Sequence, residues 1–126
     1  MERIGRVVVV VPDYDEALAY YRDKLGMAVL FDAPNGEDRF LHLGFGDDQS
    51  GIWLIKARMP VETACIGKQT GGQPTGVFYT RDIAATAERF RAHDVEIVSP
   101  VTEEDGAYHC HFRDLYGNRW VLVQLP

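Results

Sequence analysis

The sequence predicts an α+β fold made of two βαβββ modules, one after the other. The first observation is the order of elements, because a strand, a helix and three further strands can be followed twice along the 126 residues. The second is that each predicted helix begins at an aspartate directly after a strand, Asp13 in one half and Asp82 in the other. The third is the length, which is sufficient for one domain with a core of its own.

The first half opens on residues 3–11, a nearly continuous β-branched run that predicts a strand covered on both faces. Asp13 and Glu16 have the spacing of a capping box. Apolar residues at helical period follow them as far as Gly26, a typical helix-ending residue. Three strands separated by turn-rich segments are expected next, over residues 27–32, 38–45 and 51–57.

The second half repeats this plan, beginning with a strand predicted over residues 75–80. The following helix is capped by Asp82 and places Ile83, Ala87 and Phe90 on one face. Three more strands are expected, over residues 95–100, 107–114 and 119–125.

Between the halves, residues 58–74 hold proline, glycine and threonine without a clear period. They are expected to form a connector that is long enough to be a functional loop. The predicted organisation is therefore a single domain over residues 1–126, with a first module at 1–57 and a second module at 75–126.

Composition and charge exclude several classes of partner. The net charge of −6 argues against nucleic acid, because duplex binding needs clustered Lys and Arg. Cys65 and Cys110 form no CxxC motif, so we expect reduced thiols in a cytoplasmic protein. The run of five valines at residues 7–11 is too short for a signal peptide or a membrane span, so no membrane partner is expected.

Two longer motifs carry a family resemblance. "VPDYDEALAYYRDKLGM" (11–27) follows the first strand, and "FRDLYGNRWVLVQ" (112–124) lies near the end of the chain. Together, at the right ends of a duplicated plan, they resemble the vicinal-oxygen-chelate superfamily of glyoxalases, bleomycin-resistance proteins and extradiol dioxygenases. The departures are Tyr20-Tyr21, where Phe-Tyr is usual, and Leu115-Tyr116, where Pro-Asp is usual.

The resemblance covers nearly the whole chain, and it implies a cupped, eight-stranded mixed sheet with the helices outside. A small molecule would be held in the cup, since a sheet with one helix-covered face needs a partner or ligand on the other. Members of this fold commonly pair modules across a dimer, so a homodimer is also implied.

In the metal-dependent members, four matching strand positions supply the ligands, usually His, Gln or Glu. Counting from the motifs carries these positions onto Arg6, Trp53, Thr75 and Val121. None of the four is a usual ligand, and Arg6 would place a permanent positive charge where the cation should bind. We therefore expect the fold and its cavity without a metal or another cofactor.

Alternation along the strands predicts which side chains share the cavity face. Arg6 is expected there, with Trp53, Thr75 and Tyr79 from other strands. Arginine in a pocket favours an anion or a carbonyl oxygen, and Trp53 could stack on a planar ligand. The alternatives are that Trp53 and Tyr79 belong to a packed core, and that Arg6 pairs with an acidic neighbour.

His109 and His111 lie two positions apart, so on a strand both imidazoles point to the same side. Such a pair can chelate a metal, but Arg113 continues the same face and would oppose a cation. We interpret the two histidines as candidate ligand-binding or surface residues.

The leading hypothesis is a metal-independent, small-molecule-binding protein of the glyoxalase and bleomycin-resistance type. The alternative is a lyase or dioxygenase-type enzyme that uses His42, His109 and His111 as a non-standard metal site or as a general base. No catalytic residue is assigned, so the sequence leaves open whether the protein is an enzyme.

Overall fold

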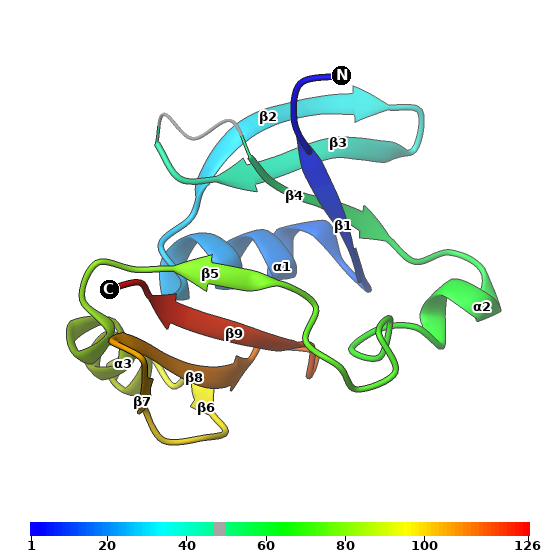
Figure 1. Cartoon of the computed structure of the whole chain (residues 1–126). Coiled ribbons are helices and arrows are strands. Elements are labelled where there is room, and N and C mark those ends of the chain that lie inside the picture. The colour runs from blue at the N-terminus through cyan, green and yellow to red at the C-terminus, as the bar shows by residue number, and fades with distance from the viewer. Residues whose placement is uncertain (47–49) are drawn as a thin grey trace. The chain divides into compact units, whose positions relative to one another are not determined.

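A computed structural model describes residues 1–46 and 50–126 of the chain (Figure 1). The chain forms two compact units, Met1–Ile66 and Gly67–Pro126, and each unit has its own sheet and its own helical segment after the first strand. The boundary between the units falls inside residues 58–74, the predicted connector. The single domain with modules at 1–57 and 75–126 stays a prediction.

The first unit contains a four-stranded sheet in the order β1-β4-β3-β2. Its elements are β1 (Arg6–Val11), α1 (Tyr14–Ala19), the π-helical turn η1 (Tyr20–Lys24), β2 (Ala28–Asn35), β3 (Asp38–Gly44), β4 (Gly51–Lys56) and the short α2 (Pro60–Thr63). Strand β1 runs parallel to β4, and the other neighbours are antiparallel. A parallel pair cannot be joined by a tight turn, and the intervening helix and two strands provide the crossover.

The predicted first helix is divided into α1 and η1. Asp13 caps α1 as expected, because its side chain accepts a backbone N–H at 2.7 Å. Leu25 N then donates to Tyr20 O at 3.3 Å, the wider spacing of a π turn. This turn leaves both Tyr20 and Tyr21 buried, and Gly26 ends the helix with a φ of 81°.

One face of this sheet forms the core of the unit, and α1 lies against β4. The core-facing strand residues are Val9, Val11, Leu41, Leu43, Ile52 and Leu54. Each of them alternates with a less buried neighbour, which leaves the opposite face of the sheet for other uses.

The second unit contains a sheet in the order β5-β9-β8-β6, with β7 also paired to β8. Its elements are β5 (Val77–Tyr79), α3 (Ile83–Ala92), β6 (Glu96–Ile97), β7 (Thr102–Glu104), β8 (Ala107–Arg113) and β9 (Arg119–Gln124). Strand β5 is parallel to β9, which repeats the β1–β4 pairing of the first unit. Ile83, Ala87 and Phe90 of α3 are buried, as the spacing predicts.

The structure contains short elements that the sequence reasoning placed differently. The strand expected over 95–100 is reduced to β6. Val98 N still donates to His111 O at 2.9 Å, but the N–H of His111 donates to the side chain of Ser99 at 2.8 Å, which interrupts the backbone ladder. Residues 101–106, which lie between two of the predicted strands, include β7, and β7 pairs with β8 through a tight hairpin. Asp105 and Gly106 both take positive φ in that hairpin, as a type I′ turn requires. Helix α2 lies within the predicted connector.

The α+β class and the order of the repeated elements are confirmed. Asp82 caps α3 with a 3.0 Å bond to Ala85 N, matching the cap that Asp13 gives α1. All eight predicted strands are present, and β7 is an addition. Within the described residues, no helix is both long enough and apolar enough to cross a membrane.

The "DLYGN" stretch owes its shape to one buried carboxylate. Asp114 Oδ1 accepts from the backbone N–H groups of Tyr116 and Asn118, each at 2.9 Å. Its Oδ2 accepts from Asn118 Nδ2 at 2.9 Å. Gly117 takes a φ of 98°, which closes the turn between β8 and β9. Asp114 therefore fixes where β9 begins.

Replacing this carboxylate should be costly. We expect Asp114→Ala to lower the free energy of unfolding by about 2–4 kcal/mol, because several buried donors lose their acceptor together. Urea unfolding followed by far-UV circular dichroism measures the change. Glu88→Ala is the control, since its exposed pairing with Arg91 should contribute little. Equal midpoints for the two variants would contradict the role given to Asp114.

Candidate functional site

The face of the first sheet that points away from its core carries an aromatic cluster. Phe31, His42 and Trp53 lie side by side on β2, β3 and β4, because the strand registers pair Phe31 with His42 and His42 with Trp53. The ring centroids are 5.7 Å apart for the first pair and 5.5 Å for the second. Phe40 extends the cluster, with its ring 5.9 Å from that of Trp53. We call Phe31, Phe40, His42 and Trp53 the aromatic platform.

A β-bulge shapes one border of the platform. The register of β2 against β3 shifts between Val29 and Phe31, so Leu30 is an extra residue. A Cβ at Gly44 would lie 2.6 Å from Leu30 Cδ1, which shows that Leu30 covers the position where a larger residue would stand. Leu30 and Phe31 are consequently both turned toward the same face. The absent side chain at Gly44 is what admits Leu30.

Arg6 sets the protonation of the histidine in the platform. Its Nε donates to His42 Nδ1 at 3.2 Å, and its NH1 donates to Gly5 O at 2.7 Å. Since a guanidinium can only donate, Nδ1 must accept, and the proton of the neutral imidazole resides on Nε2. Burial and the charge of Arg6 both lower the pKa of His42, which favours this neutral form.

Two N–H groups of the platform have no hydrogen-bond acceptor among the residues that the structure describes. They are His42 Nε2 and Trp53 Nε1, and both atoms are buried. A buried donor without an acceptor is costly unless another molecule satisfies it. The platform thus combines flat apolar area with two donors, which suits a planar molecule that carries a carbonyl oxygen.

The corresponding face of the second sheet is more polar. The β5–β9–β8 registers give one row of Val77, Val121 and His111. The next row toward the ends of β5 and β9 contains Tyr79, Val123 and His109. The rings of His109 and His111 are 6.4 Å apart, so the predicted sharing of one strand face is observed. Burial, Arg119 and His109 together lower the pKa of His111.

Comparison of the registers shows which positions in the two units are equivalent. Val8 pairs with Trp53 and Trp53 with His42 in the first unit, just as Val77 pairs with Val121 and Val121 with His111 in the second. The two histidines therefore occupy matching sites. By the same registers, Arg6 matches Thr75.

The four positions carried over from metal-dependent proteins are therefore equivalent between the units. Arg6 and Trp53 occupy two of them in the first unit, and Thr75 and Val121 occupy the matching two in the second unit. Across residues 1–46 and 50–126, no group of three or more His, Cys, Asp or Glu is arranged to hold a metal ion.

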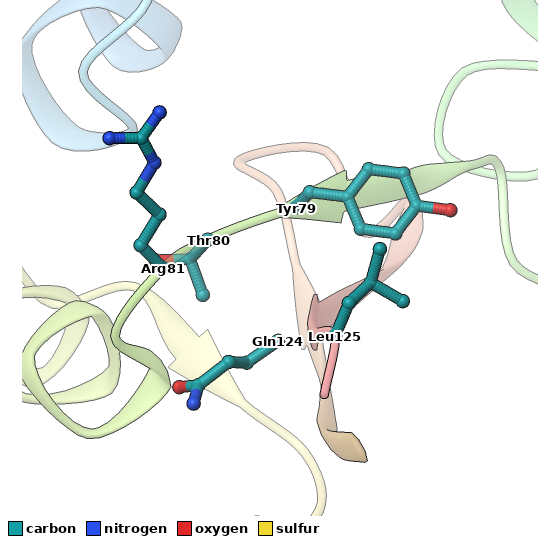
Figure 2. A pocket seen from close by; sticks show the side chains of 5 residues that line it. All are labelled: Tyr79, Thr80, Arg81, Gln124 and Leu125. Carbon is teal, nitrogen blue, oxygen red and sulfur yellow. The ribbon is translucent and has the colours of Figure 1, made fainter. Parts of the chain in front are cut away.

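A separate pocket of about 430 Å³ lies at the ends of β5 and β9 (Figure 2). It is lined by Tyr79, Thr80, Arg81, Gln124 and Leu125. The Tyr79 ring and the Leu125 side chain lie close together, whereas Arg81 extends away from them (Figure 2). The Oε1 atom of Gln124 is occupied, because it accepts from the backbone N–H of Ile83 at 2.8 Å.

Only Tyr79 of these five was among the predicted site residues, and it is 69% exposed. The other four follow directly at or after the ends of β5 and β9, so parallel pairing of those strands was the signal that could have located them. The pocket has an apolar side and one cation, and its shallow setting makes the aromatic platform the stronger candidate site.

A family of known proteins matches the residues of both units. The model of the "Glyoxalase/Bleomycin resistance protein/Dioxygenase superfamily" matches residues 3–122. The chain belongs to this superfamily.

Individual members agree with that assignment. An uncharacterized protein of Shewanella frigidimarina (strain NCIMB 400) is 32% identical over 98% of this chain and 94% of its own length. The crystal structure of UcmS2 is 30% identical, with a TM-score of 0.85 and 98% coverage of both chains. TnmS3, described as an antibiotic binding protein from Streptomyces sp. CB03234, shares the fold at 20% identity and a TM-score of 0.82, over 100% of this chain and 98% of its own.

The lowered pKa values of His42 and His111 predict that the protein loses stability in mild acid. Because their pKa values are lowered in the folded protein, the unfolded chain binds more protons than the native one as the pH falls below about 6.5. The free energy of unfolding should therefore decrease between pH 7.5 and pH 5.5, as measured by urea denaturation. His42→Gln should show a smaller decrease than the wild type. An unchanged pH dependence in this variant would contradict the environment described for His42.

Proposed function

We propose that this superfamily member is a small-molecule-binding protein that holds a planar ligand against the aromatic platform without using a metal. The carrying observation is the pair of buried donors, His42 Nε2 and Trp53 Nε1, within a row of aromatic rings. A flat ligand with a carbonyl oxygen or a similar acceptor would stack on the rings and accept hydrogen bonds from the buried donors.

The chemistry of the platform favours binding over catalysis. Its histidine has no carboxylate partner among the described residues, and Arg6 keeps Nδ1 engaged as an acceptor. An imidazole held neutral with its proton on Nε2 is a hydrogen-bond donor toward a ligand. Metal independence is supported by the residue types at Arg6, Trp53, Thr75 and Val121, of which none is a usual ligand.

Relatives of the fold give independent support for this class of function. TnmS3 is described as antibiotic-binding, and superfamily members include bleomycin-resistance proteins by the name of the family itself. At 20% identity the likeness to TnmS3 concerns the fold, so the ligand class is argued from the platform. A cytoplasmic location is part of the proposal, in keeping with the free thiols of Cys65 and Cys110.

The neutral aromatic amide 2-naphthamide is the probe for the platform. With ¹⁵N-labelled protein, we expect saturable movement of the Trp53 indole N–H signal, while the signal of Trp120 stays in place because that side chain is buried in the core of the second unit. Trp53→Ala should weaken the binding about fivefold to tenfold, since it removes a stacked ring.

Tyr108→Ala is the matched control, because Tyr108 is an exposed aromatic residue of the other unit that alternates with His109 and His111 along β8. Recovery of unchanged 2-naphthamide after incubation would separate binding from turnover. Equal affinity of the Trp53→Ala variant and the wild type would overturn the role of the platform.

We also propose that the protein is a homodimer. Apolar side chains on the sheet faces opposite the cores remain partly exposed in one chain, with Val8 at 37%, Phe31 at 50% and Val77 at 50%. Exposed apolar area of this kind is typical of surfaces that bind a partner or ligand.

Size-exclusion chromatography with light scattering tests the dimer. The expected mass is twice that of the 14.2 kDa chain, because pairing would cover the exposed apolar side chains. A mass of one chain at protein concentrations of about 100 μM, well above typical dimer dissociation constants, would contradict the proposal.

A further inference from the structure

The second unit has its own group of polar side chains, Thr75, His111 and Arg119, and none of them belongs to the aromatic platform. Thr75 N donates to Arg119 O at 2.6 Å, which extends the β5–β9 pairing two residues beyond Val77 and Val121. Arg119 in turn pairs with Arg113 on β8. Since side chains two apart on a strand share a face, Thr75 and Arg119 lie on the same side of the sheet as His111.

Arg119 has no counter-ion among the described residues, and its buried Nε has no hydrogen-bond acceptor there. The neighbouring Arg113 differs, because its NH1 donates to Glu96 at 2.9 Å. Arg119 is near enough to His111 that its charge contributes to lowering the pKa of that imidazole. The second unit thus places a positive charge beside a histidine without supplying a carboxylate for it.

Thr75 adds a second unsatisfied group. Its Oγ1 is buried and has no hydrogen-bond partner in the described part of the chain. A hydroxyl, a guanidinium and an imidazole on one sheet face form a donor set that fits the oxygens of an anion. A buried polar group without a partner is rare, and two adjacent ones point to a group that completes the site.

The repeat shows that this arrangement is particular to the second unit. The registers match Arg119 with Gly51 and Thr75 with Arg6. A Cβ at Gly51 would clash with Leu43 O, so the first unit has no room for a side chain there. Its arginine stands on the edge strand β1 instead and donates to His42. The same fold therefore presents its cation differently in the two units.

We propose that Arg119, Thr75 and His111 form an oxyanion subsite that receives the carboxylate of a small organic ligand. Arg119 donates two N–H groups to the carboxylate, and the hydroxyl of Thr75 and an N–H of His111 complete its shell. This inference rests on the proposed small-molecule-binding function, and it names the charged group of a ligand that the second unit would bind. It uses no residue of the aromatic platform.

Benzoate is the probe, and benzamide is its neutral counterpart of the same shape. With the full-length ¹⁵N-labelled chain at constant ionic strength, benzoate should shift the Arg119 Nε–H signal in a saturable manner and raise the pKa of His111. Benzamide should do neither. Arg119→Gln should weaken benzoate binding at least tenfold, and the nearly isosteric Thr75→Val about threefold to tenfold.

Arg89→Gln is the matched control, because it removes one positive charge from the exposed surface of α3. It should bind benzoate as the wild type does. Circular dichroism verifies that each variant is folded. Binding of 2-naphthamide by Arg119→Gln distinguishes failure of this subsite from failure of the proposed function, since that probe reports on Trp53.

Three results would overturn the subsite. Benzoate affinity within twofold of wild type in both Arg119→Gln and Thr75→Val would exclude the named residues. Equal binding of benzamide would exclude recognition of the charge. A loss in Arg89→Gln as large as that in Arg119→Gln would reduce the effect to the overall charge of the protein.

Discussion

The alternation of side chains along the strands of each sheet is the constraint on which the site depends. In both units a parallel strand pair, β1–β4 or β5–β9, fixes the register, and one face is then used by the core. Every second residue is left on the opposite face, whatever its chemistry. A slip of one residue in β4 would bury Trp53 and expose Leu54, so the fold and the aromatic platform cannot vary independently.

The two units show how one architecture supports different surfaces. Their helix caps, their parallel strands and the positions of His42 and His111 correspond, but the residues around those histidines do not. His42 stands among aromatic rings and accepts from Arg6, whereas His111 has Val121 as its β9 neighbour and feels the charge of Arg119. Both imidazoles have lowered pKa values, for partly different reasons. The two units share the backbone plan, but their side chains differ on both faces of the sheets; in the cores, for example, Leu41 and Ile52 of the first unit correspond to Cys110 and Trp120 of the second.

Local chemistry made much of the fold predictable from the sequence. Asp13 and Asp82 could be recognised as caps because capping depends on a few consecutive residues, and alternation identified the strand faces. The bulge at Leu30 and the hairpin that creates β7 were not recognised, since they depend on pairing between strands. The bond between Arg6 and His42 joins residues 36 apart in the sequence and could not be inferred from either neighbourhood alone. Arg119 was not predicted as a site residue, because the lack of a hydrogen-bond acceptor for its Nε among the described residues depends on which side chains surround it in the fold.

Arg6 and Arg119 differ in how their hydrogen-bond donors are used. Arg6 donates to His42 and to Gly5 O, so part of its donor capacity is used inside its own unit to orient an imidazole. An anion competing for Arg6 would release Nδ1 of His42 and disturb the tautomer that the platform depends on. No such competition exists at Arg119, whose Nε has no acceptor among the described residues. Arg6 is therefore better understood as a positioning residue for His42, and Arg119 as the cation suited to receive a charged ligand group.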